Sequence, residues 1–166
     1  MTIRFATLAD IPQIVEVGHE IQRLSRFGQL YAFDHKRVTQ QVNSIIQIGQ
    51  DKNKTHCLFV AVNSKNKIIG LLIGSTDQHM FSDQIVASIV IIGVLQEHRM
   101  SGAGVRLLGA FRKWAENRGA VELYAGINSG MNLSTMDRYM KRLGFVQTGG
   151  NYALALNESN QGDKQK

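Results

Sequence analysis

The sequence predicts a single α/β domain with a mixed β-sheet and helices on its faces. Three observations support this prediction. Segments with apolar residues at helical spacing alternate along the chain with short apolar segments of strand length. At 166 residues, the chain is long enough for one domain with a full core. Its 43% hydrophobic and 19% charged residues lie in the ordinary globular range.

The N-terminal half is predicted to contain one strand, two helices and a hairpin. Asp10 and Asp34 each precede apolar residues at helical spacing, and aspartate favours a helix start because its carboxylate accepts hydrogen bonds from free amides. In chain order, we expect a strand at 3–6, a helix from Asp10, a loop or broken helix at 25–33, a helix from Asp34, a polar loop at 49–55, and hairpin strands at 57–62 and 67–75.

The C-terminal half is predicted to alternate strands with helices. Residues 84–95 are apolar on both faces, which is typical of a strand at the centre of a sheet. Residues 105–118 predict a helix whose apolar stripe comprises Val105, Leu108, Phe111, Trp114 and Ala115. The remaining elements are a strand at 121–127, a helix at 133–143, and strand pieces at 145–148 and 152–156. The expected order is therefore βααβββαβαββ.

The domain is expected to span residues 1–156, followed by a polar tail at 157–166 that lacks periodicity. No apolar run approaches the roughly 20 residues of a membrane span. The N-terminus carries Asp10 and Glu16 where a signal peptide would need an apolar core. A lone cysteine, Cys57, cannot form an internal disulfide and suggests a reducing compartment. We therefore expect a cytoplasmic location and no membrane partner.

The charge balance is basic, with 19 Lys and Arg residues against 13 Asp and Glu residues and a net charge of +6. This balance fits an anionic partner, which could be a nucleotide cofactor or a nucleic acid. The positive residues are scattered, without the run of five to eight that marks a nucleic-acid arm. The charge alone therefore argues against a nucleic acid more than for one.

The segment with the clearest chemistry runs from a buried strand through a polar loop into the helix at 105–118. At the helix entrance lies the pattern Arg99-x-x-Gly102-x-Gly104. Free amides of a first helical turn bind anions, and glycine removes side chains that would keep a phosphate from the backbone. The pattern is neither a Walker loop nor a dinucleotide fingerprint. Taken alone, it also describes a helix start with two packing glycines.

This segment resembles the cofactor motif of the GNAT superfamily of acyl-CoA-dependent N-acyltransferases, with Val94, Arg99, Gly102 and Gly104 at the motif positions. The family's second block resembles the strand at 123–127, then Asn132, then Leu143-Gly144-Phe145. The resemblance covers about residues 3–156. It implies a GNAT-like, mainly antiparallel mixed sheet flanked by helices. It also implies an N-acetyltransferase that moves the acetyl group of acetyl-CoA to a primary amine of a small molecule or protein, without a metal.

The resemblance further implies how coenzyme A would bind. The central strand separates from its neighbour, and the pantothenate arm bonds to the backbone in the gap near a bulge. Gly93 suits such a bulge, although packing against an adjacent helix would also explain a glycine there. The implied cofactor-binding residues are Ile92, Val94, Arg99, Met100, Ser101, Gly102, Ala103, Gly104, Val105 and Asn132.

Acetyl transfer also needs an oxyanion donor and a base for the acceptor amine. The backbone N–H of Val94 is the simplest oxyanion donor. Residues 84–95 contain no carboxylate, although many relatives place a glutamate there. The sequence therefore does not identify the general base. Four residues are conceivable, and each could equally be a plain surface residue: Asp77, His79, Asp83 and Glu122.

We predict Tyr139 as the catalytic acid that protonates the leaving thiolate. Relatives often read Asn, six residues, Tyr, then Gly-Phe four and five residues later. Asn132 and Tyr139 keep the first spacing, but Gly144 follows five residues after the tyrosine. Counted back from Gly144, the position belongs to Met140, which would leave Tyr139 as a packing residue.

Acceptor specificity in this family comes largely from the region between the first two helices. Here Phe27, Tyr31 and Phe33 could line a pocket and Glu20 could hold a cationic amine, or the aromatic residues could belong to the core. A homodimer is only a family-level expectation. Two rival functions are an inactive GNAT-like domain used for binding or assembly, and a basic nucleic-acid-binding module. Binding of acetyl-CoA, followed by an acceptor screen that measures release of free thiol, would separate all three.

Overall fold

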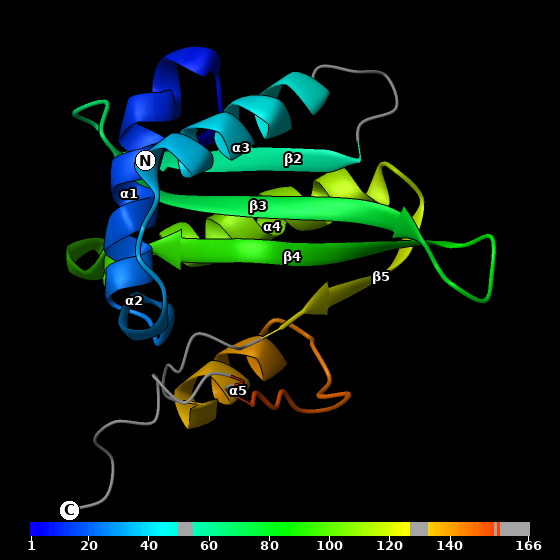
Figure 1. Cartoon of the computed structure of the whole chain (residues 1–166). Coiled ribbons are helices and arrows are strands. Elements are labelled where there is room, and N and C mark those ends of the chain that lie inside the picture. The colour runs from blue at the N-terminus through cyan, green and yellow to red at the C-terminus, as the bar shows by residue number, and fades with distance from the viewer. Residues whose placement is uncertain (50–54, 127–132, 155, 157–166) are drawn as a thin grey trace, which may run out of the picture.

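The computed structural model describes residues 1–49, 55–126, 133–154 and 156. These residues contain a five-stranded sheet with the order β1-β2-β3-β4-β5 (Figure 1). Strands β1 to β4 are antiparallel to their neighbours, and β5 is parallel to β4. The strands are β1 (Thr2–Phe5), β2 (His56–Val62), β3 (Ile68–Gln78), β4 (Ile85–Val94) and β5 (Ala120–Ala125).

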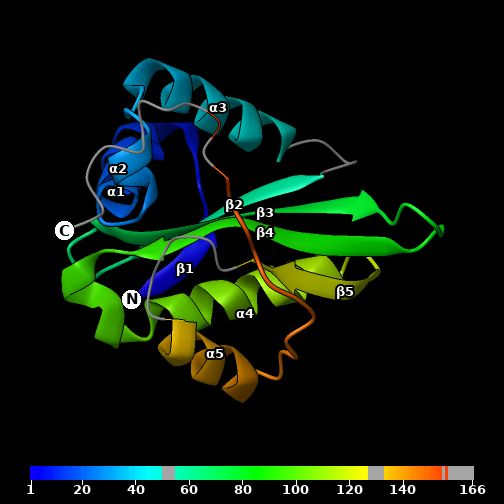
Figure 2. The same ribbon diagram turned by 60° about the horizontal axis from the view of Figure 1, so that its bottom comes forward.

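Helices cover both faces of the sheet. Figures 1 and 2 show α1, α2 and α3 on one face and α4 on the other; α5 lies past the β5 edge of the sheet in Figure 1 and on the α4 side in Figure 2. Short 3-10 helices precede α1 and α4, at Leu8–Asp10 and Gln96–Ser101. Among the described residues, no helix is both long and apolar enough to cross a membrane. The helices are α1 (Ile11–Arg23), α2 (Phe27–Leu30), α3 (His35–Ile48), α4 (Ala103–Glu116) and α5 (Leu133–Arg142).

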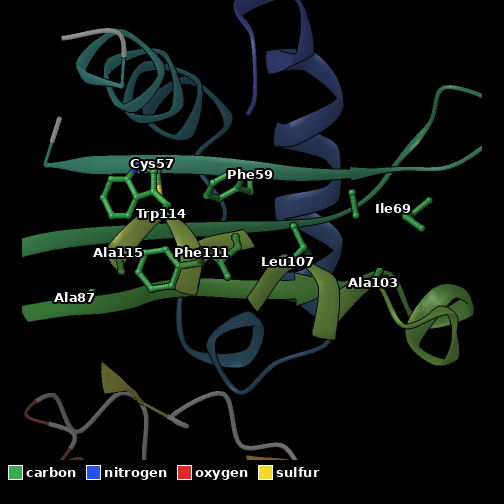
Figure 3. Close-up of a cluster of buried hydrophobic side chains, with 11 residues drawn as sticks. Cys57, Phe59, Ile69, Ala87, Ala103, Leu107, Phe111, Trp114 and Ala115 are labelled. Carbon is green, nitrogen blue, oxygen red and sulfur yellow. The ribbon is translucent and has the colours of Figure 1, made fainter. Parts of the chain in front are cut away.

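Alternation along the strands divides the core into two layers. On β2, Cys57 and Phe59 face α4, while Leu58 and Val60 face α1 and α3. The α4 layer is shown in Figure 3; its helical members are Ala103, Leu107, Phe111, Trp114 and Ala115. The opposite layer includes Ile14, Val17, Val42 and Ile46. Val105, which we expected in the stripe of α4, is instead 43% exposed on its first turn, and Leu107 is buried.

A partly buried ion pair, between the exposed Arg4 and the buried Asp10, ties the first strand to the residues that precede α1. The carboxylate of Asp10 accepts hydrogen bonds from both terminal nitrogens of Arg4, at 2.6 and 2.9 Å. It also accepts from the backbone N–H and the hydroxyl of Thr7, at 2.8 and 2.9 Å. The hydrogen bonds from Arg4 lower the pKa of Asp10 well below its usual range. Asp10 precedes α1 as expected, but its side chain accepts no hydrogen bond from the amides of that helix; as a charged group it links β1 to the 3-10 helix before α1.

The structure confirms the predicted α/β class and the order of elements up to the last helix. Asp34 caps α3 as expected, since its side chain accepts from the Arg37 N–H at 2.9 Å. The broken helix predicted at 25–33 contains the short α2. The prediction of strand pieces at 145–148 and 152–156 is wrong, because the described residues after α5 contain no strand. Val146, Tyr152 and Leu154 are at least 81% exposed. These pieces are short and separated by two glycines, and without buried apolar contacts little stabilises strand pairing.

Candidate active site

The strands β4 and β5 separate part-way along their length. Their pairing runs from Ile85 to Ile89 on β4, opposite Ala120–Ala125 on β5. β4 continues to Val94, while β5 slants away from it (Figure 1). Val90, Ile91 and Ile92 are 57%, 46% and 38% exposed. We call this opening the fork: within the described residues, no strand lies beside residues 90–94 on that side.

The backbone of β4 offers hydrogen-bonding groups to the fork. The N–H of Leu95 donates to the carbonyl of Ile69, just before Gly70 of β3, at 2.9 Å. Successive residues of a strand direct their N–H and C=O groups to opposite sides. The groups of Ile92 and Val94 therefore point away from β3 and into the fork. These two residues have the backbone orientation that a ligand extended along β4 would need.

The bulge of β4 lies at Val90 and not at Gly93, where a bulge was one of the two interpretations that the sequence left open. Ile91 pairs with Ile73 and Ile89 with Gly74, which leaves Val90 as the extra residue. Gly93 pairs regularly, and a Cβ there would lie 2.5 Å from the Cδ1 of Ile21 on α1. The glycine is thus explained by helix packing, the alternative that the sequence left open. No property of valine marks a bulge, so the sequence gave no signal for Val90.

A turn connects β4 to α4 and exposes the start of that helix. Gly102 links the preceding 3-10 helix to α4 with a φ of 77°, a conformation that favours glycine. The N–H of Arg106 donates to the carbonyl of Gly102 at 3.1 Å. The amides before Arg106 belong to the first turn, where the helix itself offers no acceptor. A Cβ on Gly102 would meet no atom within 4 Å, so space in front of the turn is open.

The residues predicted at this helix entrance contribute differently. The side chains of Arg99, Met100, Ser101 and Val105 are exposed. Ala103 is fully buried in the core, so only its backbone could meet a ligand, and its N–H already donates to the Ser101 hydroxyl at 3.3 Å. Together the turn presents main-chain donors, the N-terminal end of a helix dipole and an exposed guanidinium. This arrangement attracts anions.

Tyr139 lies beside the helix entrance. A Cβ built on Gly104 would lie 3.6 Å from the Tyr139 hydroxyl oxygen and 3.9 Å from the Cγ2 of Val94. The hydroxyl, the end of β4 and the first turn of α4 therefore meet in one place. Tyr139 is half-buried, and this burial raises the pKa of its phenol. Met140, the alternative at this position, lines a different space along β5.

Other predicted residues lie away from this place or outside the description. Asn132 lies outside the described residues. Asp77 pairs with Val86, at the far end of β4 from Val94, and His79 and Asp83 belong to the hairpin loop beyond that end. Asp83 accepts from the Gln78 side chain at 3.1 Å. The structure therefore brings none of these three base candidates to the entrance of α4.

The region between α1 and α3 has an exposed aromatic surface. Phe27 stacks on Tyr31 with ring centres 6.3 Å apart, and Tyr31 is 62% exposed. Phe33 packs against His19 at 4.6 Å between ring centres. Glu20 is held by Arg23 at 2.7 Å, as an exposed pair on one helix face. The aromatic residues border the surface, while Glu20 is already occupied by a cation.

The comparison with protein families identifies the family to which this chain belongs. Residues 19–145 match the model of the family described as "Acetyltransferase (GNAT) family". The chain belongs to the GNAT acetyltransferase family. The match covers most of the chain and confirms the resemblance predicted from the motif at Val94 to Gly104.

Solved GNAT-like structures share the fold. A transcriptional regulator from Bacillus halodurans C-125 has a TM-score of 0.73 at 21% identity, over 93% of this chain and 99% of that chain. The aminoglycoside 6'-N-acetyltransferase AAC(6')-IG from Acinetobacter haemolyticus has a TM-score of 0.70 at 18% identity, over 95% and 99%. AAC(6')-Iy, solved with a bisubstrate analogue containing CoA, has 0.71 at 18% identity, over 94% and 97%. No curated protein matches the chain.

Proposed function

We propose that this GNAT-family chain is an N-acetyltransferase that moves the acetyl group of acetyl-CoA to a primary amine. The observation that carries the proposal is the backbone of β4, which directs the groups of Ile92 and Val94 into the fork immediately before an anion-attracting helix entrance. A rod-shaped ligand with an amide-containing arm and a pyrophosphate fits this sequence of sites. Family membership supports the same co-substrate.

The residues of the turn would hold the phosphates. The amides from Met100 to Val105, apart from that of Ala103, which already donates to Ser101, would donate to the pyrophosphate oxygens, and Arg99 would add a positive charge from the exposed side. The open space in front of Gly102 and the missing side chain of Gly104 give the phosphates room. Ile92 and Val94 would bond to the amide-containing arm along β4.

Acetyl-CoA supplies an activated thioester, and the protein orients it and handles charge. The N–H of Val94 points into the fork and would stabilise negative charge that develops on the acyl oxygen. Tyr139 would donate its hydroxyl proton to the leaving sulfur, because its position beside Gly104 and Val94 lies next to the arm. Its raised pKa keeps the phenol protonated at neutral pH.

We also propose that the domain spans residues 1–156 and acts in the cytoplasm. The lone Cys57 is buried and free, which fits a reducing compartment. Burial raises the pKa of this thiol to about 12, so it stays protonated and has no nucleophilic role at neutral pH. A homodimer stays a family-level expectation.

Calorimetry with acetyl-CoA tests the co-substrate, and release of free thiol across a panel of primary amines tests the reaction. We expect saturable binding of one acetyl-CoA per chain and amine-dependent thiol release. Binding without turnover on any amine would favour an inactive GNAT-like domain. Absence of binding would overturn the proposal.

A further inference from the structure

Two exposed arginines of α5, Arg138 and Arg142, take no part in the steps proposed above. They are four positions apart, so they lie one turn apart on the same face of the helix. The ion pairs of the described residues include neither guanidinium, whereas Lys141 of the same helix pairs with Asp137 at 2.8 Å. This face of α5 therefore presents two positive charges that no carboxylate of the described residues neutralises.

The two arginines lie next to the proposed phosphate site. Arg138 directly precedes Tyr139, whose hydroxyl oxygen is 3.6 Å from the Cβ position of Gly104 in the first turn of α4. At about 100° of rotation per residue, Arg138 and Arg142 lie about 100° and 60° from Tyr139, in the same direction around the helix. Side chains of a helix lean toward its N-terminus, so the side chain of Arg142 leans back toward the turn that holds Tyr139. Both arginines are therefore within one helical turn of the residue beside Gly104.

A different flank of α5 borders the space along β5. The residues of α5 that line that space are Asp137, Met140 and Lys141. They follow one another around the side of the helix that Arg138 and Arg142 do not occupy. Since α5 lies on the α4 side of the sheet (Figure 2), its tyrosine and its two arginines are placed beside α4 rather than along β5.

Coenzyme A carries a second anionic group close to its pyrophosphate. This group is a phosphate monoester on the 3′ position of the same ribose that bears the pyrophosphate. A phosphate monoester carries about −1.5 to −2 charges at pH 7 and offers three strong acceptor oxygens. The planar guanidinium of arginine presents donors in a fork that matches phosphate geometry. With the pyrophosphate at the first turn of α4, the 3′-phosphate would lie within one ribose of that turn, which is the region that Arg138 and Arg142 border.

We propose that Arg138 and Arg142 bind the 3′-phosphate of coenzyme A, so that the chain selects acetyl-CoA over donors that lack this phosphate. The inference rests on the proposed function, because it requires the pyrophosphate to bind at the first turn of α4. It assigns the two arginines to donor specificity and gives them no part in acetyl transfer.

Arg106 provides a matched control. It is an exposed arginine in the first turn of α4, and its removal lowers the net charge as removal of either arginine of α5 does. It follows Gly104 by two residues, so it lies about 200° around the helix from the side that faces Tyr139. Its Nη1 donates to the carbonyl oxygen of Met1 at 3.0 Å. Arg106 therefore points away from α5.

The test measures the Kd of acetyl-CoA and of acetyl-3′-dephospho-CoA, which differ only in this phosphate, by calorimetry. We expect the wild type to bind acetyl-CoA about tenfold more tightly, the low end for hydrogen bonds to a charged group. The double variant Arg138→Ala/Arg142→Ala should bind both compounds with nearly equal affinity, and its loss should be confined to acetyl-CoA. Arg106→Ala should keep the wild-type ratio. Circular dichroism checks that each variant is folded.

The outcomes separate this inference from the proposed function. Equal affinity of the wild type for the two compounds would overturn the inference, as would a ratio that persists in the double variant. A double variant that loses the same factor for both compounds would also overturn it, because the arginines would then act on a group that the compounds share. If the wild type binds neither compound, the proposed function fails together with the inference. Binding of both without preference rejects the arginine site alone.

Discussion

Gly104 and Tyr139 share one small space: a Cβ atom on the glycine would lie 3.6 Å from the tyrosine hydroxyl oxygen. The glycine opens the first turn of α4, and the tyrosine comes from α5, 35 positions later in the chain. Because one residue lies in the proposed phosphate site and the other is the proposed acid, the two functions can be tested separately at this point.

Gly104→Glu should abolish detectable acetyl-CoA binding while the domain stays folded. The new side chain would fill the space in front of the first turn and add negative charge where phosphates are expected. Calorimetry measures the binding, and circular dichroism checks the fold. Gly109→Glu is the matched control, since Gly109 lies exposed on the same helix with no atom within 4 Å of its Cβ position. Unchanged affinity in Gly104→Glu would mean that the phosphates bind elsewhere.

Tyr139→Phe should lower kcat by about tenfold or more, with little change in acetyl-CoA affinity. The substitution removes the proton that the leaving sulfur needs and keeps the aromatic ring. Because burial raises the pKa of the phenol, the alkaline fall in wild-type kcat should lie above the ordinary tyrosine value of about 10. Single-turnover kinetics must show that chemistry limits the rate. An unchanged kcat under those conditions would make Tyr139 a packing residue.

Arg99→Ala should weaken acetyl-CoA binding and make it less sensitive to salt. An exposed guanidinium that meets phosphate is screened by added ions, so the wild-type Kd should rise with ionic strength. Calorimetry from low to high salt gives the slope for each protein. Arg37→Ala, an exposed arginine on α3, should keep the wild-type slope. Parallel slopes for Arg99→Ala and the wild type would remove Arg99 from the contacts.

Asp10→Asn should lower the free energy of unfolding at pH 7 by about 2 kcal/mol, as expected for hydrogen bonds to a buried charge. The folded-state pKa of Asp10 lies below its unfolded value, so its contribution is present above the unfolded pKa of about 3.9 and is lost as the pH falls below it. Urea unfolding at pH 7 and pH 3 should show the two proteins converging at low pH. Glu116→Gln, in an exposed pair, should change stability by less than about 1 kcal/mol.

Gly93→Ala should destabilise the fold by about 1–3 kcal/mol, because its Cβ would lie 2.5 Å from the side chain of Ile21. Ile21→Ala removes the obstructing atoms and costs stability through lost packing. The double variant should therefore be more stable than the sum of the two single effects predicts. Urea unfolding of all four proteins gives the coupling energy. Additive effects would show that the clash is relieved in another way.

Local signals predicted much of this molecule, and long-range packing decided the rest. The residue type alone indicates the structural role of Asp34, which caps α3, and of Gly102, which adopts a positive φ. The bulge at Val90 depends on how β3 and β4 pair, so residue type gives no warning of it. The final segment reads as strand from its apolar residues, yet strand formation also needs a partner edge and a surface to cover. The place of Tyr139 near Gly104 likewise depends on how α5 packs, which spacing alone left undecided.

The extra residue at Val90 reverses the alternation of backbone direction along β4. Before it, the carbonyl of Gln84 accepts from the N–H of His79, the residue that follows β3, at 2.8 Å, so the backbone groups of even-numbered residues point toward β3. After it, Leu95 bonds to β3 and the even-numbered Ile92 and Val94 face the other way. Counting residues from the start of β4 therefore does not predict whether the backbone groups of a residue beyond the bulge point toward β3 or into the fork. Positions equivalent to Ile92 and Val94 in other sequences must be counted backwards from the turn at Gly102. A strand transplanted into this fold in place of β4 would have to contain an extra residue at the same position.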